Sequence, residues 1–155
     1  TSNDDAWAAN LAYTGDNYGL SVTYGVVEDG IDNDTYTALN GFYSFDNGLN
    51  ISAGYEVGDL DDPVPTQDET ESYFIGINGE VGPGELGAAM GTYGTMRESG
   101  LPTHQTIPER LMYEAYYSYA VNDGMTITPI IYTVEGSSAT DMDETGFMVK
   151  TQFKF

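Results

Sequence analysis

The sequence alternates apolar and polar side chains over long stretches, and this alternation constrains the fold more than any other feature. Near the C-terminus, Phe147, Val149 and Phe153 share one parity, whereas Lys150 and Lys154 share the other. A period of two residues is the period of a β-strand, and helical spacing does not persist for three turns anywhere in the chain. The sequence therefore predicts an all-β protein.

The alternation predicts nine strands, most of them about 10 to 12 residues long. Strands of soluble proteins average about 5–6 residues, whereas a tilted strand needs about 9–11 residues to span a membrane. Strand length thus favours an antiparallel transmembrane β-barrel over a soluble sandwich. The predicted strands are 6–14, 18–27, 35–45, 48–57, 71–81, 84–96, 109–121, 124–134 and 144–155.

The connections between these strands are of two kinds. Four are tight and contain turn residues, in the stretches "TGDNYG", "FDNGL", "VGPGE" and "VNDGM", where Gly, Asn and Asp suit positive φ. Four are long and polar, at 28–34, 58–70, 97–108 and 135–143. We expect short and long connections to alternate strictly, which is typical of outer-membrane barrels with short periplasmic turns and long extracellular loops.

The two faces of each predicted strand differ in composition. One parity is apolar, and the other is small and polar, as in Ser21, Thr23, Ser52 and Gly54. On the apolar parity, aromatic residues gather at both ends of the strands, as they do at the two interfaces of a membrane barrel. A soluble core has no reason to place its rings at both rims. Near the long connections these residues are Trp7, Tyr24, Tyr55, Tyr73, Tyr113 and Phe147; near the short turns they are Tyr13, Tyr18, Tyr43, Phe45, Tyr117, Tyr119, Phe153 and Phe155.

An odd number of strands conflicts with the even number of a closed bacterial barrel. Either one predicted strand is false, or at least one strand lies upstream of Thr1. The small, polar parity leaves a void that suits a wide, water-filled pore. We therefore expect 1–155 to be the C-terminal portion of one transmembrane domain, roughly half of a barrel of about 16 or 18 strands. Partner strands are required, because hydrocarbon does not tolerate open sheet edges.

The chain is strongly acidic, with a formal net charge of −21, which argues against a nucleic-acid partner. It contains no cysteine, so disulfides and thiolate metal sites are excluded. No apolar run is long enough for a transmembrane helix, and no basic and apolar leader is present. The stretch "DGIDND" has the composition of a calcium loop but not its order. We expect solvated acidic loops and no cofactor or metal site, with loose divalent-cation bridging to anionic lipid as the alternative.

All four basic residues fall on the small, polar parity, which in a barrel faces the lumen. One interpretation is that lysine and arginine avoid lipid, where each costs about 2–4 kcal/mol at mid-depth. The other is functional: Arg110, Lys150 and Lys154 lie across the pore from carboxylates and bias ion passage. The candidate pore-lining residues are Glu56, Glu80, Arg97, Arg110, Glu114, Lys150, Gln152 and Lys154.

No catalytic constellation is visible in the sequence. The single histidine, His104, lies in a predicted loop between Pro102 and Pro108, with no nucleophile signature around it. We therefore expect a protein that is not an enzyme.

Two stretches carry a family resemblance. The C-terminal run "YEAYYSYAVNDGMTITPIIYTVEGSSATDMDETGFMVKTQFKF" resembles the last three strands of cyanobacterial outer-membrane porins, the OprB-like proteins with an N-terminal SLH domain. The stretch "GELGAAMGTYGTM" resembles their preceding strand. The resemblance implies a sixteen-stranded outer-membrane pore for ions and small solutes, with inorganic ions more plausible than sugars. It also implies a homotrimer and a terminal aromatic residue read as an assembly signal. Independently of the resemblance, long loops on the extracellular side would place the C-terminus in the periplasm.

The sequence thus predicts an outer-membrane porin that acts by passive diffusion. A non-conducting barrel that serves as an anchor or adhesin is the first alternative. A soluble, secreted β-sandwich that acts as a binding module is the second.

Overall fold

The computed structural model describes residues 5–29, 32–61, 69–93, 110–136 and 141–154, and within these ranges it contains nine strands and no helix. This confirms the predicted all-β class and all nine predicted strands. No described segment is a helix long and apolar enough to cross a membrane. The strands are β1 (Ala6–Thr14), β2 (Tyr18–Asp29), β3 (Asp32–Ser44), β4 (Asn50–Asp59), β5 (Glu69–Val81), β6 (Gly84–Thr92), β7 (Leu111–Asn122), β8 (Met125–Val134) and β9 (Glu144–Phe153).

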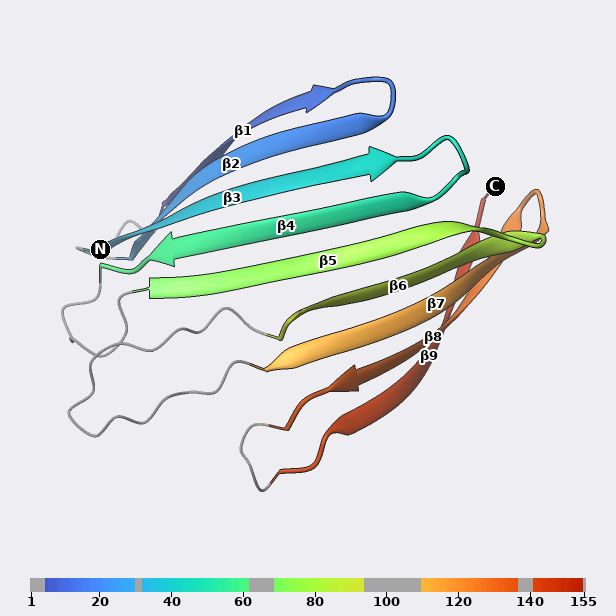
Figure 1. The fold of residues 1–155 in the computed structure, drawn as a ribbon. Helices are drawn as coiled ribbons and strands as arrows, with labels where there is room; N and C mark the ends of the chain where they lie inside the picture. Colours follow the sequence, from blue (N-terminus) through green and yellow to red (C-terminus); the bar gives the residue numbers. More distant parts are fainter. Residues whose placement is uncertain (1–4, 30–31, 62–68, 94–109, 137–140, 155) are drawn as a thin grey trace.

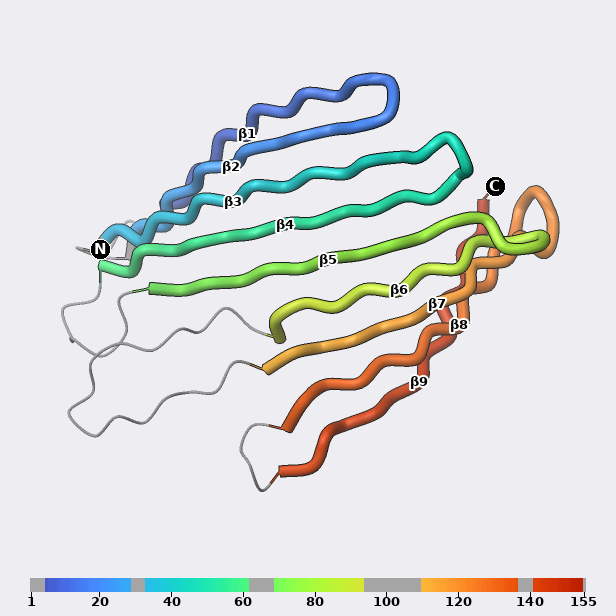
Figure 2. The backbone as a smooth tube through the Cα atoms, in the orientation of Figure 1, coloured from blue at the N-terminus to red at the C-terminus, as the bar shows by residue number. Residues whose placement is uncertain are grey.

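The nine strands form a single antiparallel sheet in which each strand pairs with its neighbours in sequence, in the order β1 to β9. The chain therefore passes back and forth across one continuous surface (Figure 2). Figure 1 shows the short turns at one end of the sheet, together with the C-terminus, and the N-terminus at the other end. β1 and β9 are the two edge strands, and they do not pair with each other, so the sheet is not closed.

The connection between β2 and β3 is not the long loop predicted at 28–34. β2 continues to Asp29, β3 begins at Asp32, and these two residues are paired, so only positions 30 and 31 separate the strands. The prediction was wrong because it took acidic residues as the end of strand structure, whereas ladder hydrogen bonds need only the backbone. The strand bounds confirm that the other three long connections exist, although the strand predicted at 84–96 ends at Thr92.

The tight turns use glycine and asparagine in the expected way. Gly48 and Gly82 have φ of 83° and 61°, in the left-handed region that glycine enters without steric cost. The side chains of Asn47 and Asn122 each accept a hydrogen bond from the backbone N–H two residues ahead, at 3.1 and 2.9 Å. These are the local bonds by which asparagine stabilises a turn. Among the described glycines only Gly48 and Gly82 have positive φ, so the glycine expectation holds in two of the four turns.

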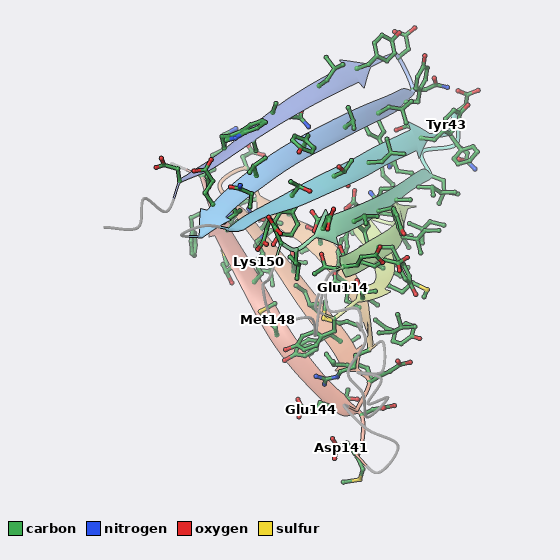
Figure 3. All side chains as sticks on the ribbon, turned by 90° about the vertical axis from the view of Figure 1, so that its left-hand side faces the viewer. Tyr43, Glu114, Asp141, Glu144, Met148 and Lys150 are labelled. Carbon is green, nitrogen blue, oxygen red and sulfur yellow. The ribbon has the colours of Figure 1, made fainter. Side chains whose placement is uncertain are left out.

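The register assigns every strand residue to one of two faces, because directly paired residues place their side chains on the same side of a sheet. Trp7 pairs with Val26, and Leu11 pairs with Val22, which itself pairs with Leu39. We call this side the outer face. The alternate residues form the inner face, toward which the sheet bends; Figure 3 shows Glu114, Met148 and Lys150 on this side.

Neither face of the sheet is covered by a second layer of described residues. Val134 is the only buried apolar side chain in the described part of the chain, at 6% exposure. A sandwich would bury the apolar face of one sheet against another sheet. The described residues instead form one curved layer whose apolar face is open.

Candidate functional site

The middle of the outer face is an exposed aliphatic band. Leu11, Leu39 and Ile131 are 75%, 58% and 53% exposed. Among the described strand residues in this register, the charged side chains of the outer face are confined to the long-connection end of β2, β4 and β5, at Glu28, Asp59, Glu69 and Glu71. An exposed apolar surface of this extent is rare on a soluble monomer, and such surfaces are typical of protein–protein and membrane contact sites.

Aromatic side chains border this band at the long-connection end. Trp7 and Tyr24 lie with their ring centroids 5.7 Å apart, and Tyr73 is paired directly with Tyr55. Two tyrosine hydroxyls at this border bind carboxylates. Tyr55 donates a 2.7 Å hydrogen bond to Glu71, and Tyr113 donates a 3.3 Å hydrogen bond to Glu135. Phe147, which is 69% exposed and paired with Ile131, lies on the same face.

A second aromatic border lies at the short-turn end. The rings of Tyr13 and Tyr18 are 5.7 Å apart, and those of Tyr43 and Phe45 are 4.7 Å apart in an edge-to-face arrangement. The Tyr43 hydroxyl accepts a hydrogen bond from Asn17 in the first turn. The outer face of this end also carries Tyr117, Tyr119 and Phe153. Phe155, the last predicted aromatic residue, lies outside the described residues.

The two borders are evenly spaced. Trp7 and Tyr13, Tyr18 and Tyr24, Tyr113 and Tyr119, and Phe147 and Phe153 are each six positions apart on their own strand. Six positions correspond to about 20 Å along a strand. The described part of the predicted aromatic set therefore forms two parallel belts on one face.

The inner face is held together by polar contacts between neighbouring strands. Asn10 donates a 2.7 Å hydrogen bond to Thr23, and Thr128 donates a 3.1 Å hydrogen bond to Ser118. Glu85 accepts two hydrogen bonds, from Asn78 at 2.9 Å and from the Tyr116 hydroxyl at 2.8 Å. Glu85 was not among the predicted pore-lining residues, although its parity on β6 places it on the inner face.

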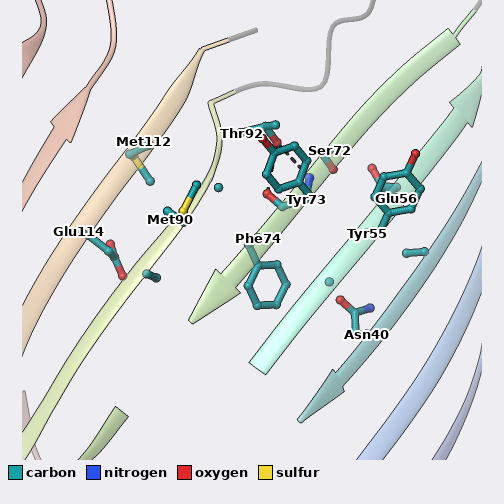
Figure 4. A pocket seen from close by; sticks show the side chains of 14 residues that line it. Asn40, Tyr55, Glu56, Ser72, Tyr73, Phe74, Met90, Thr92, Met112 and Glu114 are labelled. Carbon is teal, nitrogen blue, oxygen red and sulfur yellow. Dashed lines mark hydrogen bonds between the residues drawn. The ribbon is translucent and has the colours of Figure 1, made fainter. Parts of the chain in front are cut away.

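Three predicted pore-lining carboxylates lie on the inner face. Glu80 is paired with Glu85 near the short turn between β5 and β6. Glu56 and Glu114 both line a hollow of about 530 Å³. Figure 4 shows them on the two sides of this hollow, with the Phe74 ring between them. Glu56 and Glu114 place two carboxylates on the wall of this hollow, so the hollow favours positive charge.

The described basic residues lie apart from these carboxylates. Lys150 is exposed and is paired with Thr128, in the row that continues through Ser118 to Glu85. Gln152 and Lys154 follow on the same strand edge and are exposed. Lys150 and Glu85 therefore lie in the same row of paired residues on the inner face, separated by Thr128 and Ser118.

Arg110 lies at the long-connection end of β7, where its guanidinium is bound locally. Its Nε donates a 2.8 Å hydrogen bond to the Glu135 carbonyl oxygen, and its guanidinium lies 4.8 Å from the centre of the Tyr93 ring. These two contacts hold the side chain at the rim of the sheet. Arg97 and His104 lie outside the described residues.

The side chains of the inner face are larger than the sequence predicted. Five aromatic side chains lie on it, and each pairs directly with a glycine of a neighbouring strand. The prediction of a wall of Gly, Ala, Ser, Thr and Asn with scattered charge was therefore incomplete, because it overlooked rings of the inner parity. These ring and glycine pairs are Phe42 with Gly19, Tyr36 with Gly58, Phe74 with Gly54, Tyr116 with Gly87, and Tyr132 with Gly146.

The described residues contain no group of three or more His, Cys, Asp or Glu side chains placed to hold a metal ion. In comparisons with known proteins, no protein-family model matches this chain and no curated protein shows significant sequence similarity to it.

Proposed function

We propose that this chain forms part of the wall of a transmembrane β-barrel in an outer membrane, and that the barrel is a water-filled channel for ions and small hydrophilic solutes. The observation that carries the proposal is the outer face. It is apolar, exposed and free of charge across its middle, and an aromatic belt borders it on each side. The spacing of about 20 Å between belts, along the strand, is on the scale of the roughly 25 Å apolar band of known barrels.

The belts also match the chemistry of a membrane interface. Tyrosine and tryptophan prefer the headgroup level, where the ring is apolar on one side and its polar atom can still find a partner. The hydroxyls of Tyr55 and Tyr113 bind carboxylates at one border, and those of Tyr43 and Tyr117 bind turn groups at the other. The hydroxyls of these four belt residues are therefore hydrogen-bonded away from the aliphatic band.

The edges of the sheet require further strands. In hydrocarbon, unpaired N–H and C=O groups cost several kcal/mol each, so a spanning sheet must be closed. β1 and β9 run in the same direction, because each begins at the long-connection end. A fully antiparallel barrel therefore needs an odd number of additional strands between them. We propose that the remaining strands of the same protein supply them, within a barrel of about sixteen strands that assembles as a trimer.

The inner face supports passive conduction, because it presents hydroxyls, amides and carboxylates to the space that the barrel would enclose. A non-conducting barrel that acts as an anchor or adhesin is the second candidate. The large inner side chains Met112, Ile130 and Met148 favour it, since they occupy part of the lumen.

Reconstitution of the native protein into planar lipid bilayers tests the proposal. We expect detergent-dependent extraction from the outer-membrane fraction and stepwise, ohmic conductance after reconstitution. Stable insertion with no conductance would favour the non-conducting barrel. A monodisperse protein that needs no detergent would contradict membrane insertion.

A further inference from the structure

We infer that the glycines beneath the inner-face rings set the open cross-section of the channel, because they allow those aromatic side chains to lie against the wall. This inference rests on the proposed channel function. It assigns a role in solute-size selection to Gly19, Gly54, Gly58, Gly87 and Gly146, and to the rings that cover them.

In each pair the ring overlaps the position that a Cβ on the glycine would take; the Thr70 hydroxyl also overlaps it at Gly58, and the Asn40 side-chain oxygen does so at Gly54. A Cβ added at Gly54 would overlap the Phe74 ring, and a Cβ added at Gly87 would overlap the Tyr116 ring. The same holds for the other three glycines and their partner rings. Each ring therefore occupies the space that a side chain at the neighbouring glycine would take. Pairing of an aromatic residue with a cross-strand glycine is a known way to cover exposed backbone in a sheet.

Two of these rings show what holds a ring flat against the sheet. The Tyr116 hydroxyl reaches Glu85 on the strand that carries Gly87, through a 2.8 Å hydrogen bond, so the ring is fixed at its far end as well as at its Cα. Phe74, labelled in Figure 4, lies over Gly54, and it remains 43% exposed. The rings thus form part of the wall surface rather than a barrier across the lumen.

A methyl group at such a glycine occupies the space against the sheet in which the ring lies. The ring must then rotate away from the wall, and in a closed barrel the available space is the lumen. Displaced rings narrow the channel and replace polar surface with apolar surface. The expected effect grows with the size of the permeating solute.

The chain offers a matched control. Gly25 also lies on the inner face and also pairs with Tyr36, but the Tyr36 ring covers Gly58 on the other side. A Cβ at Gly25 would have the Trp7 carbonyl oxygen as its nearest neighbour, at 3.6 Å, which is an ordinary contact. Gly25→Ala therefore adds the same methyl group to the same face without displacing a ring.

The test is single-channel conductance of the native protein and of Gly54→Ala, Gly87→Ala and Gly25→Ala in planar bilayers, with liposome swelling in neutral sugars of increasing size. We expect Gly54→Ala and Gly87→Ala to lower conductance and to slow large sugars more than small ones, with Gly25→Ala unchanged. Adding Tyr116→Ala to Gly87→Ala should restore conductance to at least the native value.

A second set of variants keeps the inference testable if the alanine variants fold poorly. If the rings already lie flat, Tyr116→Ala and Phe74→Ala on the native glycine background change conductance only slightly. A large increase would show that the rings project into the lumen and would overturn the inference. Folded Gly54→Ala and Gly87→Ala with native conductance would overturn it as well. A native protein that does not conduct would instead contradict the proposed function itself.

Discussion

The hydroxyl of Tyr117, on β7, donates a 2.9 Å hydrogen bond to the carbonyl oxygen of Val81, the last residue of β5. The bond crosses β6 and the short turn that joins it to β5. A ring of the short-turn belt therefore also fixes the turn beside it. One side chain thus belongs to an aromatic belt of the outer face and also stabilises a turn.

Removal of this hydroxyl should weaken the sheet without changing its surface. We expect Tyr117→Phe to lower the free energy of unfolding from lipid vesicles by about 1 kcal/mol, the usual net value of one hydrogen bond. Tyr119→Phe is the control, because Tyr119 lies on the same strand and face with no recorded hydrogen-bond partner among the described residues. Urea titrations followed by tyrosine and tryptophan fluorescence measure both. Equal losses in the two variants would contradict the role given to the Tyr117 hydroxyl.

A charge in the aliphatic band should be far more costly than a charge on the adjacent inner residue. Val22 lies on the outer face of β2, between the belts, and Ser21 lies on the inner face. We expect Val22→Arg to destabilise the inserted protein by about 2–4 kcal/mol, because the guanidinium is held at mid-depth in lipid. Ser21→Arg should cost much less, since its side chain reaches water. In a soluble protein the exposed Val22 would tolerate arginine, so similar and small effects in both variants would contradict the lipid-facing assignment.

The inner carboxylates should favour cations. We expect Glu56→Gln combined with Glu114→Gln to lower the ratio of cation to anion permeability, and Lys150→Gln to raise it, because each change removes a charge from the wall. Reversal potentials in a potassium chloride gradient measure this ratio, and high salt should reduce the differences. Glu71→Gln is the control, since Glu71 lies on the outer face and binds Tyr55. A shift as large in Glu71→Gln as in the double variant would place the selectivity outside the lumen.

The strands and their faces were predictable because both depend on the simplest pattern in the chain. Alternation with a period of two and the turn residues between runs fix the pairing, as at Leu11 with Val22 and Tyr55 with Tyr73. Once the register is known, every outer and inner residue follows. The ends of the strands were less predictable, because the backbone ladder continues to Asp29 and Asp32, in a stretch of sequence without apolar alternation.

The inner rings were harder to predict, because their meaning lies in pairs that are distant in sequence. Phe42 is near Gly41 in the chain, yet the glycine beneath its ring is Gly19 on the neighbouring strand. Likewise, the contacts of Arg110 with Tyr93 and Glu135 bring together residues from three separate segments. The sequence indicates these ring and glycine pairs only when neighbouring strands are aligned, because each inner ring then lies opposite a glycine.

Single-cysteine labelling in lipid vesicles tests the central claim most directly, since the native chain contains no cysteine. Leu39 and Ala53 lie on the outer face and are more exposed in this sheet than their inner-face neighbours Asn40 and Ser52. We predict that a charged, membrane-impermeant thiol reagent labels Asn40→Cys and Ser52→Cys but not Leu39→Cys and Ala53→Cys, because lipid covers the outer pair. If Leu39→Cys and Ala53→Cys were instead labelled at least as fast as the less exposed Asn40→Cys and Ser52→Cys, the sheet would not span a membrane.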